Sequence, residues 1–253
     1  MVNGHVIELK KPIPRMRGHV VVAVLAGDTL QTDTAAALGG MMLMTRTGAL
    51  ITVKNSLVPC GRNQAVAQAY ELGGEWLLFL DSDMVFPTDT LVRLLSHGKD
   101  VVGGTYPKRV PPHNLLYKLL PGVDRVEQTQ GLVEVAGLPG GCLLINMRVF
   151  DQLLKPYFQT PAFRVDDGNV VEAVTGAKPP RWLRDYITRE RLPDLVGEDF
   201  FFCAAARHAG FQCWLDVEIS QRLGHIGQQV WYPQTYEEES HGGPASVGIP
   251  KVG

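Results

Sequence analysis

Two aspartates set one residue apart carry the clearest chemistry in this sequence. Asp81 and Asp83 directly follow an apolar run at residues 76–80, which predicts a strand buried on both faces. Such a strand ends at the carboxyl edge of a parallel sheet, where open α/β folds bind ligands. Two carboxylates at that edge can hold a divalent cation, and the cation can hold phosphates. The alternative is a plain turn, since Asp and Ser both favour turns.

A second pair of acids, Glu198 and Asp199, follows Gly197 at the start of a predicted helix. Acidic residues are favoured at helix N-termini, so simple capping is one interpretation. The other is a general base beside an anionic substrate. Neighbouring negative charge raises the pKa of a carboxylate, which suits it to proton abstraction.

His225 follows the last predicted strand, which returns to the same edge of the sheet. A lone histidine is more often structural than a ligand, but the place of His225 after a strand that returns to the sheet edge makes the ligand an equal alternative. Imidazole nitrogen beside carboxylate oxygen suits Mn²⁺, and Mg²⁺ also favours carboxylate oxygen. The candidate metal ligands are therefore Asp81, Asp83 and His225, and the candidate cofactor is Mn²⁺ or Mg²⁺.

Two weaker signals accompany these acids. Arg62 stands at the start of a helix predicted over residues 61–72, where a cation and backbone amides form an anion site. The alternative is an exposed arginine in the first turn. Gly140 and Gly141 lack Cβ atoms and let the backbone approach a ligand, although a turn explains them equally well.

The stretch at residues 106–112 is basic and rich in proline. Lys108 and Arg109 within it could neutralise a leaving phosphate. A solvated basic loop explains them just as well.

Positioning these residues requires alternating strands and helices. The predicted strands cover residues 20–26, 49–53, 76–80, 100–102, 115–120, 133–135, 142–146 and 211–219. The predicted helices lie around residues 35–42, 61–72, 91–95, 147–155 and 199–206. This alternation predicts βαβ units and a single α/β domain of Rossmann-like type. We expect a mostly parallel central sheet flanked by helices, with a small antiparallel portion towards the later strands.

The composition suits a soluble protein with a sizeable core, because 45% of the 253 residues are hydrophobic and 20% are charged. A net charge of −2 gives no reason to expect a nucleic-acid partner. The four cysteines form no C-x-x-C pair, which disfavours a zinc or redox site. We expect them to be buried free thiols, which indicates a cytoplasmic protein.

The N-terminal residues give no reason to expect membrane targeting. Residues 1–18 lack the apolar region of a signal peptide, and the apolar run at 20–26 is too short to cross a membrane. Residues 1–232 are expected to form the domain, and residues 233–253 a flexible tail. The irregular segment at 156–195 is predicted to be a functional loop with a hairpin turn near residues 165–170.

In their order along the chain, these motifs resemble the nucleotide-sugar glycosyltransferases with the GT-A fold, most of all the family 2 group. The resemblance spans roughly residues 20–227. Its segments are Gly61-Arg62-Asn63-Gln64-Ala65, residues 76–83, Gly140-Gly141-Cys142, Gly197-Glu198-Asp199 and His225.

The resemblance implies an enzyme that moves a sugar from a UDP- or GDP-sugar to an acceptor hydroxyl, with inversion favoured. Asp83 and His225 would bind the metal, and Asp81 would contact the metal or the ribose. Asp199 would be the catalytic base, assisted by Glu198. The acceptor stays open among a glycan, a lipid-linked sugar, a protein and a modified nucleobase.

The same resemblance assigns the remaining contacts with the donor. Arg62 would lie near the nucleotide, as would the stretch from Ala26 to Asp28. Gly140 and Gly141 would border the donor sugar, and the loop at 156–195 would close over it.

The chain departs from the family pattern in two places. Asn55-Ser56 stands where family members usually carry an aspartate that helps to read the base. The first strand ends in Leu25-Ala26-Gly27 rather than in a proline-led loop.

Three other functions share parts of this pattern. Residues 81–85 also fit the first motif of haloacid dehalogenase-type phosphatases, but position 203 is Cys where that family needs a second acid. A non-catalytic nucleotide-sugar binder would keep the fold without the chemistry. A nucleotidyltransferase would need a Gly-rich loop and a Lys after the first strand, which residues 25–28 do not supply.

Overall fold

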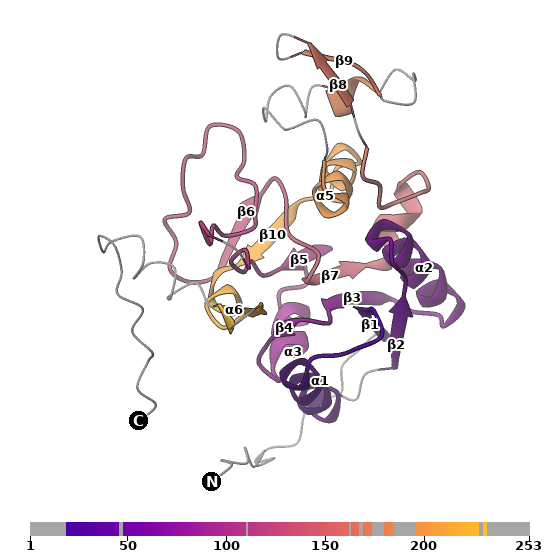
Figure 1. Cartoon of the computed structure of the whole chain (residues 1–253), viewed down its shortest axis with the longest axis vertical. Helices are drawn as coiled ribbons and strands as arrows, with labels where there is room; N and C mark the ends of the chain where they lie inside the picture. Colours follow the sequence, from indigo (N-terminus) through magenta and orange to yellow (C-terminus); the bar gives the residue numbers. More distant parts are fainter. Residues whose placement is uncertain are drawn as a thin grey trace.

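The computed structural model describes residues 19–45, 48–109, 111–161, 163–166, 169–173, 180–184, 196–227 and 230–231. They form a single α/β domain around a seven-stranded sheet with the strand order β2-β1-β3-β7-β5-β10-β6 (Figure 1). In this sheet β7 and β6 run antiparallel to their neighbours, and the other strands share one direction. The mostly parallel central sheet predicted from the sequence is confirmed.

The sheet strands are β1 (Val20–Ala26), β2 (Ala49–Lys54), β3 (Trp76–Asp81), β5 (Val101–Gly103), β6 (Leu132–Val135), β7 (Cys142–Asn146) and β10 (Cys213–Asp216). The helices are α1 (Thr32–Thr45), α2 (Val58–Glu71), α3 (Thr90–Ser96), α5 (Glu198–His208), α6 (Val217–Ser220) and the 3₁₀ helix η1 (Met147–Gln152). A small antiparallel sheet contains β4 (Met84–Val85), β11 (Gly224–Ile226) and β12 (Val230–Trp231). The expected hairpin is present as β8 (Phe163–Asp166) and β9 (Asn169–Ala173).

Strand β1 shows why the central strands are continuous apolar runs in the sequence. Its side chains alternate between two buried clusters, with Val21 and Ala23 in one and Val20, Val22 and Val24 in the other. Helices α2 and α5 cover the first cluster, and α1, α3 and α6 cover the second. Both faces of the sheet are therefore buried, as expected for parallel strands between helical layers.

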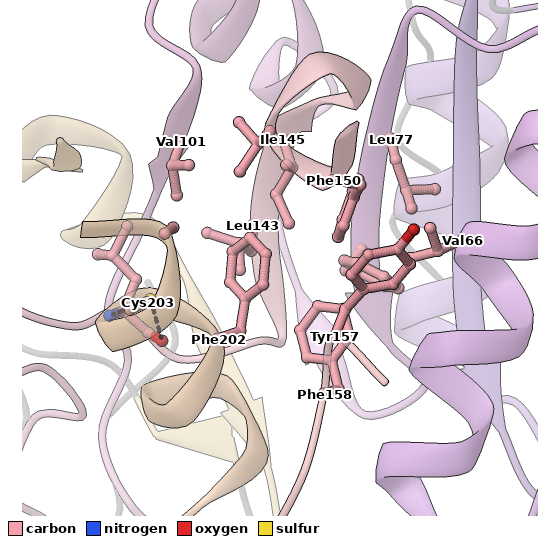
Figure 2. Packing of buried hydrophobic residues seen from close by; sticks show 14 of the residues in the cluster. Val66, Leu77, Val101, Leu143, Ile145, Phe150, Tyr157, Phe158, Phe202 and Cys203 are labelled. Carbon is pink, nitrogen blue, oxygen red and sulfur yellow. Dashed lines mark hydrogen bonds between the residues drawn. The ribbon is translucent and has the colours of Figure 1, made fainter. Parts of the chain in front are cut away.

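Aromatic side chains pack among the aliphatic ones in the cluster under α2 and α5 (Figure 2). The Phe158 ring stacks on Phe202 at 4.8 Å and meets Phe79 edge-on at 5.3 Å. Burying a side chain of this size contributes about 1.5–3 kcal/mol relative to exposure. Strand β3 and helix α5, which carry the acids singled out in the sequence, are thus fixed to one rigid core.

Several predicted elements differ from the structure. The expected strand at 115–120 forms only isolated bridges, from Leu115 to Pro107 and from Lys118 to Gly137. The expected helix at 147–155 is the shorter 3₁₀ helix η1. Cys60 is exposed, whereas the other three cysteines are buried and free as expected.

The predicted tail at 233–253 and parts of the predicted loop at 156–195 lie outside the described residues. The boundary between domain and tail therefore stays a prediction. None of the helices in the described ranges is long and apolar enough to span a membrane.

Candidate functional site

A cleft of about 370 Å³ opens at the carboxyl ends of β1, β2 and β3, the edge at which the sequence placed the site. It is lined by Ala26 at the end of β1, Asn55 after β2, Asp81 at the end of β3, Asp83 just after it, and His225 on β11, together with Tyr106 and Arg109. Asp81 and His225 lie far apart in the chain. The fold therefore brings the three candidate metal ligands to one surface.

Backbone pairing between two short strands fixes Asp83 and His225 relative to each other. His225 pairs with Met84 across β11 and β4, and Ile226 N donates to Asp83 O at 2.8 Å. The His225 Nε2 atom lies 3.7 Å from Asp83 Oδ2. The distance is set mainly by the strands, so it does not depend on long flexible side chains.

The orientation of the His225 ring follows from its second nitrogen. Nδ1 lies 2.9 Å from Pro107 O, and a carbonyl can only accept, so Nδ1 carries the proton and donates. Nε2 is thereby left to face Asp83. A hydrogen bond from one ring nitrogen to a backbone carbonyl is the arrangement that orients metal-binding histidines.

Asp83 is also paired with Arg109, whose Nη1 lies 2.8 Å from Asp83 Oδ2. Burial alone would raise the pKa of Asp83, but His225 and Arg109 outweigh burial and hold the pKa below its usual value. Asp83 is therefore an anion at neutral pH.

Arg62 occupies a different place from the one expected. Helix α2 begins at Val58, so Arg62 lies inside the helix rather than at its start, and its side chain is 2% exposed. Its guanidinium donates to Asp81 Oδ1 at 3.2 Å, to Glu198 Oε1 at 3.1 Å and to Gly140 O at 3.1 Å. Although burial lowers the pKa of Arg62, these acids outweigh burial and raise it. Arg62 is the buried counter-ion that joins the two acid pairs.

The two glycines make room for this arrangement. A Cβ on Gly140 would lie 2.3 Å from Arg62 Nη2, and one on Gly141 would lie 2.3 Å from the Tyr106 hydroxyl. Both contacts are shorter than any real packing distance, so larger residues would displace the side chains. The expected contact of these glycines with a donor sugar stays a prediction.

Tyr106 is a site residue that the sequence analysis missed. Gly141 N donates to its hydroxyl at 2.8 Å, and its ring meets His225 edge-on at 4.9 Å. Burial, and next the charge of Asp81, raise the pKa of Tyr106 well above its usual value, so the phenol stays protonated. Its position shortly after β5, which ends at Gly103, towards the carboxyl edge of the sheet, was the available signal.

The second acid pair lies on the other side of Arg62. Asp199 Oδ2 accepts from Gly140 N at 3.1 Å, and Asp199 Oδ1 accepts from Phe200 N at 2.7 Å. Burial and then the neighbouring Glu198 raise the pKa of Asp199 to about 6, against the opposing effect of Arg62. Burial is also the main cause of a raised pKa at Asp81. Asp199 thus has the ionisation behaviour of a general base working near neutral pH.

Of the remaining residues predicted to contact the nucleotide, one lines the cleft and one does not. Ala26 lines the cleft, whereas Asp28 is exposed outside it and lies 3.4 Å from Lys54. Asn55 lines the cleft where the family would carry an aspartate, and its Oδ1 accepts from Leu57 N at 2.9 Å.

The metal site expected from the sequence is not assembled as a complete shell. No group of three His, Cys, Asp or Glu residues within the described ranges could hold a metal ion. The Asp83 Oδ2 and His225 Nε2 atoms nevertheless face each other at 3.7 Å, and carboxylate oxygen and imidazole nitrogen are both ligands of divalent cations. The two side chains could contribute to a Mn²⁺ or Mg²⁺ site, whose other ligands would have to come from outside this pair.

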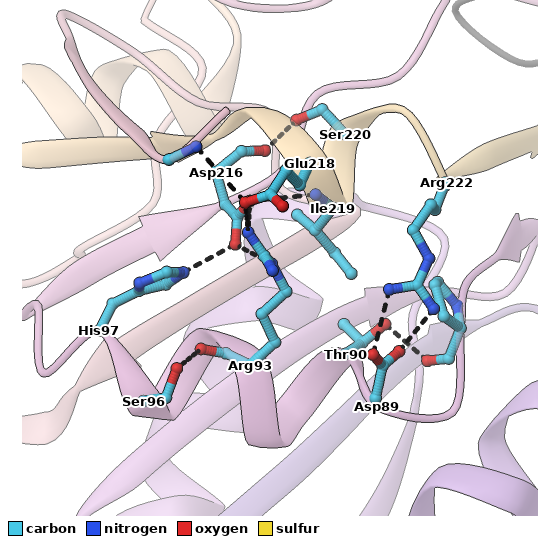
Figure 3. Close-up of polar contacts among 12 residues, drawn as sticks. Asp89, Thr90, Arg93, Ser96, His97, Asp216, Glu218, Ile219, Ser220 and Arg222 are labelled. Carbon is cyan, nitrogen blue, oxygen red and sulfur yellow. Dashed lines mark hydrogen bonds and ion pairs between the residues drawn. The ribbon is translucent and has the colours of Figure 1, made fainter. Parts of the chain in front are cut away.

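A buried ion-pair network holds the chain segment that leads to His225 (Figure 3). The fully buried Asp216 accepts from Arg93 Nη2 at 2.8 Å and from Ile219 N at 3.0 Å, and lies 2.7 Å from His97 Nε2. The bond to Ile219 caps α6 and ends β10, which is why the strand expected at 211–219 is shorter. Helix α6, which ends at Ser220 shortly before β11 and His225, is thereby tied to α3.

Comparison with solved structures shows a known fold. The chain is similar to A197 from STIV, with a TM-score of 0.53 and 14% identity over 85% of this chain and 91% of that one. A second match, residues 1–349 of S. aureus TarS, has a TM-score of 0.26 and 15% identity over 53% of this chain and 48% of that one. No protein-family model matches the chain, and no curated protein matches it significantly.

Proposed function

We propose that this protein is a metal-dependent glycosyltransferase of the GT-A type, which moves a sugar from a nucleoside-diphosphate sugar to an acceptor hydroxyl. The observation that carries the proposal is the meeting of Asp83 and His225 at 3.7 Å in a cleft at the carboxyl edge of the sheet. Through Asp81 and Arg62 the same cleft is linked to Asp199, a carboxylate poised as a base. The fold shared with A197 from STIV can host many functions, so the proposal rests on the site residues.

Each residue of the site has a role in this proposal. Asp83 and His225 would hold the Mn²⁺ or Mg²⁺ ion, which neutralises charge on the departing nucleoside diphosphate when bound. Asp81 would contact the ion or the ribose. Arg109, in the same cleft, adds positive charge where the diphosphate leaves.

Asp199 would remove the acceptor proton as the hydroxyl attacks the anomeric carbon. Its two oxygens are fixed by Gly140 N and Phe200 N, so the carboxylate is oriented before substrate arrives. Arg62 neutralises Glu198 and keeps that charge from raising the pKa of Asp199 further. One base and a direct displacement favour inversion at the anomeric carbon.

Thermal unfolding in the presence of UDP- and GDP-sugars, with and without Mn²⁺, tests donor binding. A donor that binds the native state raises the unfolding temperature, and the rise should require Mn²⁺. Release of nucleoside diphosphate from the same donor distinguishes an enzyme from a non-catalytic binder. Hydrolysis of p-nitrophenyl phosphate without use of any nucleotide sugar would instead favour the phosphatase.

The variant Asp199→Asn tests the assigned base. Transfer should fall by about 10²–10⁴-fold, because general bases contribute that much, while donor affinity stays within about two-fold. The measurement is turnover together with donor titration. Loss of donor binding in this variant would show that Asp199 belongs to the donor site instead.

A further inference from the structure

The ion pair between Asp83 and Arg109 places a cation of the chain itself where the proposed function needs a metal. Arg109 Nη1 lies 2.8 Å from the same oxygen, Asp83 Oδ2, that lies 3.7 Å from His225 Nε2. All three side chains line the cleft. A guanidinium and a divalent ion at this carboxylate compete for one negative charge, so they exclude or weaken each other.

The Arg109 guanidinium can move away from Asp83 while the aliphatic part of the side chain, its stem, stays in place. The side chain is 54% exposed, against 20% for Asp83, and ion pairs this open to solvent are weak. The stem lies along Gly227, where a Cβ would sit 3.4 Å from Arg109 Cβ and 3.7 Å from its Cδ. The guanidinium can therefore turn within the cleft without the loop moving away from β11.

The same loop also holds the histidine. Pro107 O accepts from His225 Nδ1, two residues before Arg109. The contact that orients His225 Nε2 towards Asp83 is thus separate from the contact that neutralises Asp83. Removing the guanidinium from Asp83 leaves His225 oriented.

We propose that Arg109 is an exchangeable counter-ion of the donor site. It neutralises Asp83 in the metal-free protein, yields that carboxylate to the divalent ion, and then pairs with the diphosphate of the donor. Guanidinium groups suit this second partner because they bind phosphate oxygens through two parallel hydrogen bonds. The inference rests on the proposed function and adds an order of events to it.

Two titrations on Arg109→Gln separate the steps, the first with Mn²⁺ alone and the second with UDP or GDP in saturating Mn²⁺. The variant should bind Mn²⁺ alone about two- to five-fold more tightly, because the competing cation is gone. It should bind the nucleoside diphosphate about ten-fold more weakly, because a charged hydrogen-bond donor is lost.

Lys108→Gln is the matched control. It removes the same charge from the neighbouring exposed position, which does not line the cleft, and should change either affinity by less than about two-fold. Arg109→Lys keeps the positive charge but loses the pair of parallel hydrogen bonds that a guanidinium can donate. It should return Mn²⁺ affinity to the wild-type value while diphosphate affinity recovers only in part.

The outcomes are distinct. An Arg109→Gln variant that binds Mn²⁺ no more tightly than the wild type overturns the exchange, and so does a fall in both affinities together, which would make Arg109 a structural residue of the loop. A wild-type protein that binds neither Mn²⁺ nor either diphosphate contradicts the proposed function itself, and the exchange with it.

Discussion

At the scale of single residues, the site depends on ionisable groups whose usual exposure or pKa is changed by their neighbours. Arg62 is a buried cation, which is tolerated because it has three acceptors within 3.2 Å. Asp199 is a carboxyl whose pKa is about 6 because burial and Glu198 act against its charge. Such changes cost folding free energy and concentrate at functional sites.

Gly140→Ala tests the packing of Arg62. The new Cβ would lie 2.3 Å from Arg62 Nη2, and the guanidinium cannot move without breaking its bonds to Asp81 and Glu198. We expect a loss of about 2 kcal/mol in unfolding free energy, measured by denaturant titration. Gly39→Ala is the control, because a Cβ there meets nothing within 4 Å and helix α1 should gain about 0.5–1 kcal/mol. Equal effects of the two changes would refute the packing argument.

Asp199→Asn also makes a prediction about stability. The native pKa of about 6 exceeds the ordinary value, so the native state holds this proton more tightly than the unfolded chain does. The carboxyl therefore favours folding below about pH 4, and that contribution is lost as the pH rises through about 6. The amide removes this dependence, so relative to the wild type the variant should gain about 2–3 kcal/mol between pH 4 and 8.

The comparison requires denaturant unfolding of both proteins at several pH values. Asp28→Asn changes an exposed carboxylate paired with Lys54 and should track the wild type across the same range. A difference between Asp199→Asn and the wild type that stays constant from pH 4 to 8 would show that Asp199 is not perturbed.

At the scale of elements, the short segments β4, β11 and α6 position Asp83 and His225. These segments were the hardest to predict from the sequence. The long apolar strands β1 and β3 are evident in the sequence because burial on both faces leaves no polar residue in β1 and none in β3 before Asp81. Strand β10 was predicted too long, since the pattern at 211–219 does not reveal that the Asp216 side chain caps a new helix. The expected strand at 115–120 failed because its partners at Pro107 and Gly137 form only single bridges.

Arg93→Ala tests whether the network around Asp216 holds α6 in place. The change leaves the fully buried Asp216 with only His97 and Ile219 N as partners, which should cost about 3 kcal/mol of unfolding free energy. The pKa of Asp216 is also expected to rise: burial raises it in the wild type, and Arg93 is the main group that holds it low. The wild type should therefore lose stability as the pH falls below about 4, and the variant should lose less.

Arg222→Ala is the matched control for the element scale. Arg222 also makes two bonds to a carboxylate, Asp89, but both side chains are almost half exposed, so the loss should stay below about 1 kcal/mol. If Arg93→Ala and Arg222→Ala lower the unfolding free energy by the same amount in denaturant titrations, burial of Asp216 adds nothing to its ion pair. The proposed role of the network then fails.

At the scale of the whole molecule, the site forms because distant segments end at one edge of the sheet. That convergence was predictable, because parallel strands place their carboxyl ends together, and it accounts for Asp81, Asp83 and His225. The buried position of Arg62 was not predictable, since it depends on acceptors from β3, α5 and the loop before β7 that only the folded chain assembles. Tyr106 was missed for the same reason, because its partner is the backbone of Gly141.

The convergence itself can be measured as a coupling between Asp83 and His225. If both hold one ion, Asp83→Asn and His225→Gln should each remove most of the Mn²⁺-dependent rise in unfolding free energy seen with UDP or GDP. That rise is about 2.7 kcal/mol at a hundred-fold excess over the dissociation constant. The double variant should lose no more than the worse single variant, because an ion that is already absent cannot be lost twice.

Asp100→Asn, which breaks an ion pair with Arg148 just before β5 at the opposite edge, should keep the full increment. Losses that simply add, each single variant retaining about half of the increment, would mean that the two residues act at separate places, and the site would then have to be sought elsewhere in the cleft.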